Sequence, residues 1–231
     1  MQIVAHRGGA ELFPENTITA ILGLEKMGID MIECDVHLSS DGELIAIHDD
    51  NLLRTAGIDR KVKEMTRAEL KHIHAGDEYG IPALKDLLDA SSLPFVVELK
   101  TPETVISLES MLKANPNWTE RIYPLSFYHE ILFYLRQQFP SLVCGALLAG
   151  FVVDPVQVAK AANCQMLSLH YEGLQPSYVE RCHQGGIFVS VWNPITEKAI
   201  SESINAKVDA IGSDRPDLVI KLLGEGAREK K

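Results

Sequence analysis

Short apolar runs of β-type residues alternate with amphipathic stretches along almost the whole chain. Each run is followed by apolar residues at helical spacing or by a helix-capping residue, and the eight runs begin at Ile3, Met31, Phe95, Ile122, Leu142, Met166, Ile187 and Ala210. Strands and helices that alternate in this way build βαβ units with parallel strands. Eight units in 231 residues average about 29 residues each, close to the size of one βαβ element. The pattern therefore predicts a (β/α)8 TIM barrel.

Two local features refine this prediction. Several predicted helices start with a capping residue followed by proline, as at Thr101-Pro102 and Asp154-Pro155. The stretch from about Asp49 to Pro82 breaks the alternation, because it carries Asn, Gly and mixed charges with little strand character. We expect one barrel domain over residues 1–231, with a small insertion at about 49–82, after the second strand region, that caps one end of the barrel.

The composition is that of an ordinary soluble globular protein, with 46% hydrophobic and 23% charged residues. The formal charge is 22 − 32 = −10, which disfavours nucleic acid and anionic membrane surfaces as partners. A phosphate-bearing ligand must therefore be held by local cations. No stretch approaches the ~18 to 20 apolar residues that span a bilayer, so stable membrane insertion is not expected.

The cysteines indicate a reducing compartment. Cys34, Cys144, Cys164 and Cys182 form no C-x-x-C pair and no short-loop framework, so no disulfide is predicted. The apolar run 1–5 is too short for the hydrophobic region of a signal peptide. We expect a cytoplasmic protein, and a homodimer stays open.

Three carboxylates come from two of the predicted strands. Side chains two residues apart in a strand share a face, so Glu33 and Asp35 point the same way, as do Glu98 and Lys100. Strand ends in such a barrel open on the active site. Carboxylates that converge there repel one another and either take up protons or bind a cation. An all-oxygen set suits Mg²⁺ or Ca²⁺ better than Zn²⁺, although either glutamate alone could form an ordinary salt bridge.

Two histidines close strand-like runs. His6 follows the first run and precedes Arg7-Gly8-Gly9, a turn whose amides could approach an anion, and His48 follows the run 44–47. Imidazoles titrate near neutral pH, so this pair suits general acid and base catalysis. A solvated or hydrogen-bonded histidine is the simpler alternative for each, and also for His37, His72 and His74, to which we assign no role.

A longer series of motifs resembles the glycerophosphodiester phosphodiesterase family. Its N-terminal part comprises His6-Arg7-Gly8, Pro14-Glu15-Asn16-Thr17, Glu33-Cys34-Asp35-Val36, Asp41-Gly42 and His48-Asp49. The similarity continues through Ile81-Pro82-Ala83-Leu84, Glu98-Leu99-Lys100, Ser126-Phe127, Trp192-Asn193 and Ser213-Asp214-Arg215-Pro216. Ordered agreement over nearly the whole chain makes the resemblance specific.

The resemblance implies a (β/α)8 barrel that hydrolyses glycerophosphodiesters, small-molecule substrates, to sn-glycerol 3-phosphate and an alcohol, with one divalent cation, Mg²⁺ or Ca²⁺. It implies the following roles: Glu33, Asp35 and Glu98 as metal ligands, His6 and His48 as the acid and base, and Arg7 and Lys100 as phosphate contacts. Which histidine is the acid stays open. So does the nucleophile, which is water or the glycerol 2-hydroxyl.

The C-terminal half departs from the family pattern. Leu125 stands where a serine is frequent, and Asn193 and Ser213 stand where threonine is common, but none carries the expected chemistry. Trp192 is a candidate apolar wall against the glycerol carbons, with a barrel-core tryptophan as the alternative. A lysophospholipase D-like enzyme, a lyase that leaves a cyclic phosphate, and a non-catalytic binding protein are the competing functions. The polar insertion disfavours a lipid-binding rim.

Overall fold

The chain folds into a closed barrel of parallel strands in the computed structural model, which describes residues 1–76 and 78–228. Within this part of the chain, one nine-stranded sheet has the order β1-β11-β10-β9-β8-β7-β6-β2-β3, and β1 also pairs with β2, which closes the barrel. The parallel strands are β1 (Gln2–Ala5), β2 (Met31–Leu38), β6 (Phe95–Leu99), β7 (Ile122–Ser126), β8 (Gly145–Leu148), β9 (Met166–His170), β10 (Phe188–Trp192) and β11 (Ala210–Ser213). This confirms the predicted (β/α)8 architecture.

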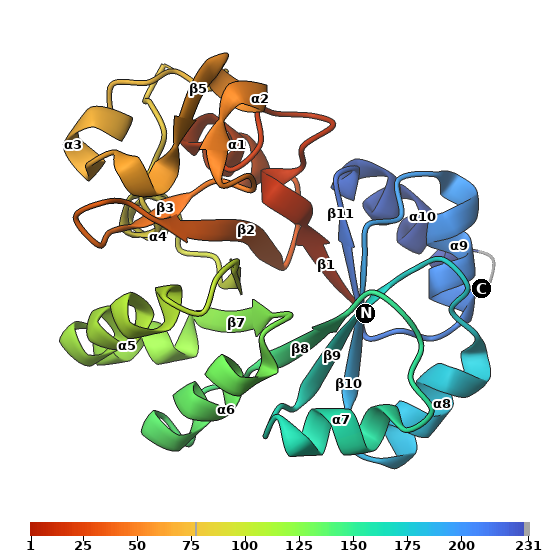
Figure 1. Cartoon of the computed structure of the whole chain (residues 1–231). Coiled ribbons are helices and arrows are strands. Elements are labelled where there is room, and N and C mark those ends of the chain that lie inside the picture. Colours follow the sequence, from red (N-terminus) through yellow and green to blue (C-terminus); the bar gives the residue numbers. More distant parts are fainter. Residues whose placement is uncertain (77, 229–231) are drawn as a thin grey trace.

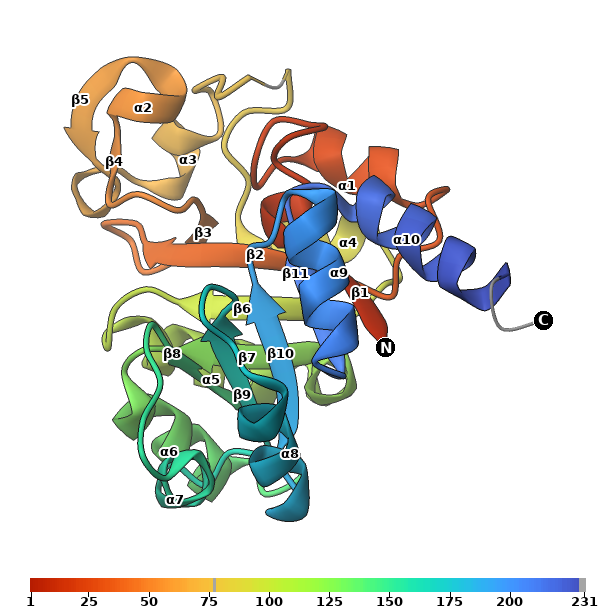
Figure 2. The same cartoon turned by 90° about the vertical axis from the view of Figure 1, so that its right-hand side faces the viewer.

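Helices surround the strands (Figures 1 and 2). They are α1 (Ile18–Leu24), α4 (Leu84–Ala90), α5 (Thr104–Ala114), α6 (His129–Gln138), α7 (Pro155–Ala161), α8 (Pro176–Gln184), α9 (Glu197–Asn205) and α10 (Pro216–Arg228), with the 3₁₀-helices η1 (His6–Gly8) and η3 (Pro116–Glu120). The Asp154 side chain caps α7 as expected, since it accepts from the Gln157 N–H. Thr101-Pro102 instead forms a turn just before α5, because the Thr101 carbonyl accepts from the Thr104 amide.

The strands separate two apolar layers. Side chains that face the helices are almost completely buried, and Ile32, Val36, Phe95 and Val97 have exposed fractions of 0%. The alternate positions face the inside of the barrel and form a separate cluster, whose members Val4, Met31, Val96, Leu125, Leu147, Met166 and Ala210 keep exposed fractions of 3% to 8%. The barrel interior is therefore less tightly filled than the layer beneath the helices.

The predicted insertion forms a compact appendage on β2 (Figure 1, upper left). Its elements are β3 (Leu44–Ala46), which pairs antiparallel with β2, then β4 (Asn51–Leu52), α2 (Leu53–Ala56), β5 (Ile58–Lys61), η2 (Val62–Glu64) and α3 (Arg67–Leu70). They pack around their own hydrophobic cluster, which is Ile45, Ile47, Leu52, Val62, Met65, Leu70, Ile81 and Ala83.

This cluster includes residues that precede Asp49, so the packing of the appendage starts within the run 44–47. The segment also holds a two-stranded sheet, β4 with β5, where the sequence shows little strand character. β4 is only two residues long, too short for the alternation that identifies strands. The domain boundaries proposed from the sequence stay a prediction.

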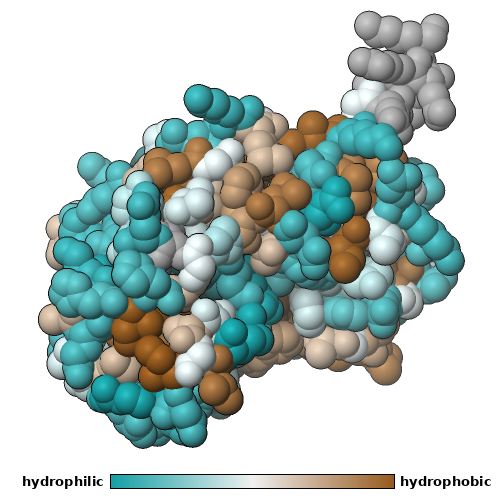
Figure 3. Space-filling model, turned by 90° about the horizontal axis from the view of Figure 1, so that it is seen from above, coloured by the Kyte–Doolittle hydropathy of each residue, from teal (hydrophilic) through white to brown (hydrophobic). Residues whose placement is uncertain are grey.

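Hydrophilic residues cover most of the face seen in Figure 3, and hydrophobic residues form several separate patches on it. Among the described residues, no helix combines the length and the apolar character that crossing a membrane requires.

Candidate active site

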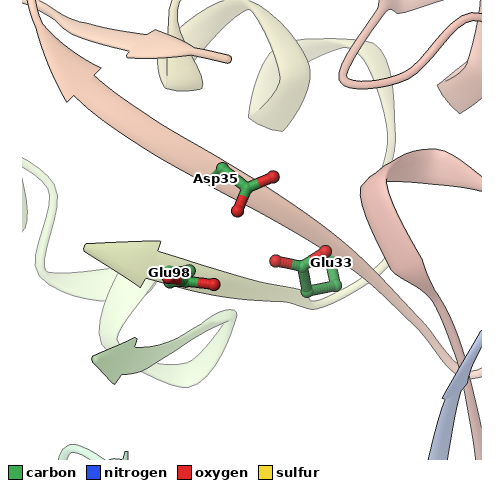
Figure 4. A group of neighbouring side chains, drawn as sticks. All are labelled: Glu33, Asp35 and Glu98. Carbon is green, nitrogen blue, oxygen red and sulfur yellow. The ribbon is translucent and has the colours of Figure 1, made fainter. Parts of the chain in front are cut away.

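The three carboxylates predicted from strand alternation meet at one place. Asp35 on β2 lies directly opposite Glu98 on β6 in the strand register, and Glu33 is two residues before Asp35. One carboxylate oxygen of each lies within 4.8 Å of the other two. Figure 4 shows the three groups pointing into the same space between the strands. These donors are all oxygen atoms, which is the ligand set that hard divalent cations prefer.

Burial and mutual repulsion shift the pKa values within this group. Burial and the neighbouring charge of Asp35 raise the pKa of Glu33 to about 8. Burial and Asp35 also raise the pKa of Glu98. Burial alone would raise the pKa of Asp35 too, but the cations of Lys100 and Arg7 outweigh it and lower that pKa. The carboxylates therefore fit a bound cation, which would relieve the repulsion that now favours a proton on Glu33.

Two basic side chains stand beside the carboxylates. Lys100 Nζ lies 2.8 Å from Glu98 Oε1 and donates to Asp35 Oδ1 at 3.3 Å. Arg7 Nε lies 3.4 Å from Asp35 Oδ2, and Asn16 Nδ2 donates to the same oxygen at 3.1 Å. Among the described residues, the buried Arg7 Nε has no hydrogen-bond partner. Arg7 Nε therefore faces the Asp35 carboxylate as an ion pair without the geometry of a hydrogen bond.

The turn that follows β1 holds Arg7 in place. Arg7, Gly8 and Gly9 have φ angles of 49°, 78° and 79°, and a Cβ at Gly8 would lie 2.8 Å from the Ala20 Cβ. The left-handed backbone and this close approach explain the glycine at position 8. Two amides of this turn are hydrogen-bonded within the protein and are not free for a ligand anion. Arg7 N–H donates to Glu33 Oε2 at 2.8 Å, and Gly9 N–H donates to the His6 carbonyl.

His6 is held by an aspartate from the other end of the chain. Its Nδ1 lies 2.7 Å from Asp214 Oδ1, and its Nε2 lies 3.8 Å from Glu33 Oε2. Burial would lower the pKa of His6, but the charge of Glu33 and the hydrogen bond to Asp214 raise it. Burial would raise the pKa of Asp214, but its hydrogen bond with His6 lowers it. An ionised carboxylate only accepts, so Nδ1 donates to Asp214, and Nε2 faces the carboxylates.

Sequence reasoning missed this support for His6. Asp214 was part of a motif without an assigned role, and Asn193 was regarded as a departure of no consequence for the chemistry. Asn193 Nδ2 donates to Asp214 Oδ2 at 2.5 Å, and the Asp214 amide donates back to Asn193 Oδ1 at 2.8 Å. Asn193 therefore holds the aspartate that contacts His6, a supporting contact that the sequence did not predict. The position of Asp214 just after the last strand was the available signal.

His48 has a similar arrangement on the appendage. Its Nδ1 lies 2.7 Å from Asp49 Oδ1. Hydrogen bonding from Arg54 lowers the pKa of Asp49 to about 2. Asp49 therefore stays ionised and accepts the Nδ1 proton. His37 Nε2 lies 3.1 Å from the His48 carbonyl, which places His37 behind the site. His72 and His74 are exposed and line no part of the main cavity.

These groups share one cavity of about 780 Å³. One half of its mouth is charged or titratable, and is lined by His6, Arg7, Glu33, His48, Glu98 and Lys100. The other half is mostly aromatic and apolar, and is lined by Phe127, His170, Tyr171, Trp192 and Ile195. The structure thus brings all eight sequence-predicted site residues close together, with Asp35 buried directly behind the cavity wall.

Trp192 is the centre of the apolar half. Its ring centroid lies 4.8 Å from that of His170 and 6.1 Å from that of Phe127, both in edge-to-face geometry. Its indole Nε1 donates to the Ser168 carbonyl at 3.4 Å. Trp192 is packed against the barrel interior and also lines the cavity, and its contact with the glycerol carbons stays a prediction. His170 was not predicted, although alternation along 166–170 places it at the mouth.

Comparison with known proteins supports a single family. Residues 6–218 match the sequence model of the glycerophosphoryl diester phosphodiesterase family. A glycerophosphodiester phosphodiesterase from Caldanaerobacter subterraneus subsp. tengcongensis is 31% identical over 238 residues, which cover 97% of this chain and 98% of that protein. Among solved structures, a phosphodiesterase from Oleispira antarctica in complex with the product sn-glycerol-3-phosphate superposes with a TM-score of 0.89 at 26% identity, covering 97% of each chain.

The link between His6 and Asp214 leads to a titration experiment. In metal-free protein, Asp214→Asn should lower the pKa of His6, because it removes the negative charge and the strong acceptor that stabilise the imidazolium. NMR titration of the imidazole nitrogens measures this pKa. Asp209→Asn, which affects the distant pair of His183 with Asp209, is the matched control and should leave His6 unchanged. Equal His6 titration in Asp214→Asn and wild type would contradict the assignment.

Proposed function

The chain belongs to the glycerophosphoryl diester phosphodiesterase family, and we propose that it hydrolyses glycerophosphodiesters to sn-glycerol 3-phosphate and an alcohol. One observation carries the proposal. Three carboxylates suited to a cation lie at the wall of a cavity that two histidines also line, and each histidine is backed by an aspartate. Non-catalytic binding does not require this combination of groups. The chain is an enzyme of the phosphodiesterase class.

Glu33, Asp35 and Glu98 would hold one divalent cation, either Mg²⁺ or Ca²⁺. The cation, when bound, polarises the phosphoryl group and offsets the charge that gathers on its oxygens. The support for this assignment is the chemistry of the donors, together with a pKa of about 8 for Glu33, which burial and the charge of Asp35 raise.

Arg7 and Lys100 bind the nonbridging phosphate oxygens. Both form ion pairs with Asp35, and both line the cavity beside the carboxylates. A chain with a net charge of −10 repels phosphate at long range, so cations at the site must supply the attraction. Trp192 packs against the glycerol carbons from the apolar half of the mouth.

His6 and His48 move the protons. Each Nδ1 is committed to an aspartate, which leaves Nε2 to exchange a proton with substrate. One histidine takes a proton from the nucleophile, and the other gives a proton to the departing alkoxide oxygen. The same geometry serves water or the glycerol 2-hydroxyl as the nucleophile, and a cyclic phosphate forms in the second case.

Product analysis of variants tests this mechanism. His6→Ala and His48→Ala should each lower kcat for glycerophosphocholine by roughly 10²- to 10⁴-fold, because each loses a general acid or base. His183→Ala, at an exposed position outside the cavity, is the control. Phosphorus NMR identifies the products, and a cyclic phosphate that persists would show that the enzyme is a lyase and not a hydrolase. Wild-type turnover in either site variant would refute the assignment, and full turnover in EDTA would refute the metal role.

Cation binding should depend on pH. Glu33, with its pKa of about 8, is mostly protonated at neutral pH in the metal-free protein and must lose that proton to bind a cation. Affinity for Mg²⁺ or Ca²⁺ should therefore rise with pH up to about pH 8 and level off above it. Calorimetry in two buffers of different ionisation enthalpy measures the proton released on binding. An affinity that does not change between about pH 6 and pH 8 would contradict the assignment of Glu33 as a metal ligand.

A specific observation favours lysophospholipids as a second substrate class. Phe127 and Ile195 at the mouth are 46% and 40% exposed, and the cavity continues between the inward-facing barrel residues to Phe188 at the start of β10. An acyl chain fits such an apolar path. The inserted segment is polar, as expected, but the apolar rim comes from the β7 and β10 ends.

Filling the lower cavity tests this second class. Ser190 lines the cavity inside the barrel and is 8% exposed. Ser190→Leu should lower kcat/KM for lysophosphatidylcholine by roughly tenfold, since displacing two methylenes costs about 1.6 kcal/mol. Turnover of glycerophosphocholine by the same variant should be unchanged, which also shows that it is folded. An equal effect on both substrates, or no turnover of lysophosphatidylcholine by wild type, would exclude an acyl chain in the barrel.

A further inference from the structure

Arg54 makes a connection that the proposed mechanism does not use. It lies on the one-turn helix α2 of the inserted segment, and all three of its guanidinium nitrogens donate hydrogen bonds. Nε donates to Asp49 Oδ2 at 2.7 Å, and Nη1 and Nη2 donate to the two carboxylate oxygens of Glu15 at 2.7 Å each. Glu15 belongs to the barrel, in the loop between η1 and α1.

We propose that Arg54 is a positioning residue for His48, which it holds in register with the barrel through Asp49 on one side and Glu15 on the other. The inference rests on the proposed role of His48. It assigns a function to a residue that makes no contact with the cavity and lies outside the three-carboxylate group.

His48 needs such an anchor because of where it lies. Its side chain is 32% exposed, and it sits in the loop after the short strand β3, on a segment with its own hydrophobic cluster. Asp49 is the next residue, so it moves with the same loop and cannot fix His48 by itself. The bidentate pair of Arg54 with Glu15 ties this loop to the body that carries the carboxylates.

Glu15 also connects Arg54 to Arg7 through its Oε1 atom, which accepts from Arg54 Nη2. Glu15 Oε1 lies 3.8 Å from Arg7 Nη1, and Arg7 Nε lies 3.4 Å from Asp35 Oδ2. A line of alternating charges thus runs from His48 through Arg54 to the proposed phosphate-binding arginine. His6 has the equivalent support within the barrel, where Asn193 holds Asp214. Arg54 therefore does for His48 what Asn193 does for His6.

Only arginine suits this position. Its planar fork serves both oxygens of one carboxylate and leaves Nε for a second carboxylate. A lysine ammonium is a point charge that cannot reproduce three directed hydrogen bonds to two partners. Hydrogen bonding from Arg54 also keeps the pKa of Asp49 at about 2, so Asp49 accepts the Nδ1 proton of His48 throughout the working range of pH.

The test uses variants of the full chain with glycerophosphocholine and saturating Mg²⁺. Arg54→Ala should lower kcat roughly 10- to 100-fold with little change in KM, because orientation of the histidine is lost and the phosphate contacts remain. Arg54→Lys should recover little of this loss. Added guanidinium ion, far below denaturing concentrations, should restore part of the turnover of Arg54→Ala and none of that of His48→Ala. Arg60→Ala removes the same charge from the same segment and should behave as wild type.

A double variant distinguishes failure of this inference from failure of the proposed role of His48. In a His48→Ala background, Arg54→Ala should cause little further loss, since the residue it positions is gone. Two results would overturn the inference alone. In the first, the kcat losses of Arg54→Ala and His48→Ala multiply in the double variant. In the second, His48→Ala is inactive but Arg54→Ala has the same kcat as Arg60→Ala. A fully active His48→Ala would overturn the proposed mechanism first. If Arg54→Ala lowers the unfolding midpoint, the charge-conserving Arg54→Lys takes its place in the single- and double-variant measurements of kcat.

Discussion

Mutual repulsion of buried carboxylates is the constraint on which the site depends. Glu33, Asp35 and Glu98 converge from two adjacent strands into a region of low polarity, where their charges cannot be screened by water. Lys100 and Arg7 compensate Asp35, yet Glu33 keeps a pKa of about 8. A divalent cation held by these three residues would resolve this conflict and would supply positive charge for a phosphodiester substrate.

The carboxylates were predictable because their geometry is local. Residues two apart on a strand share a face, which fixes Glu33 relative to Asp35, and neighbouring parallel strands bring Glu98 opposite Asp35. The partner of His6 was not predictable in this way. Asp214 is 208 residues distant, and it reaches His6 only because β1 pairs with β11 when the barrel closes. No periodic pattern in the sequence carries such a contact.

The inserted segment shows a second limit of sequence reasoning. Its mixed charges indicated an irregular cap, yet it folds around its own hydrophobic cluster and brings His48 to the mouth. β4 is too short for a recognisable alternation, and in β5 a single apolar residue, Ile58, is followed by three charged residues. Apart from Trp192, the apolar half of the mouth was not predicted, because Phe127 and Ile195 are single residues from separate loops whose proximity depends on strand order.

Diffraction from a crystal soaked in Mn²⁺, a hard cation with an anomalous signal, tests the central claim most directly. The account predicts one strong anomalous peak bonded to oxygens of Glu33, Asp35 and Glu98, with Lys100 Nζ displaced from the space between the carboxylates or turned toward the phosphate position. A peak at other residues, or three carboxylates that stay paired with Lys100 and Arg7 at saturating metal, would contradict it.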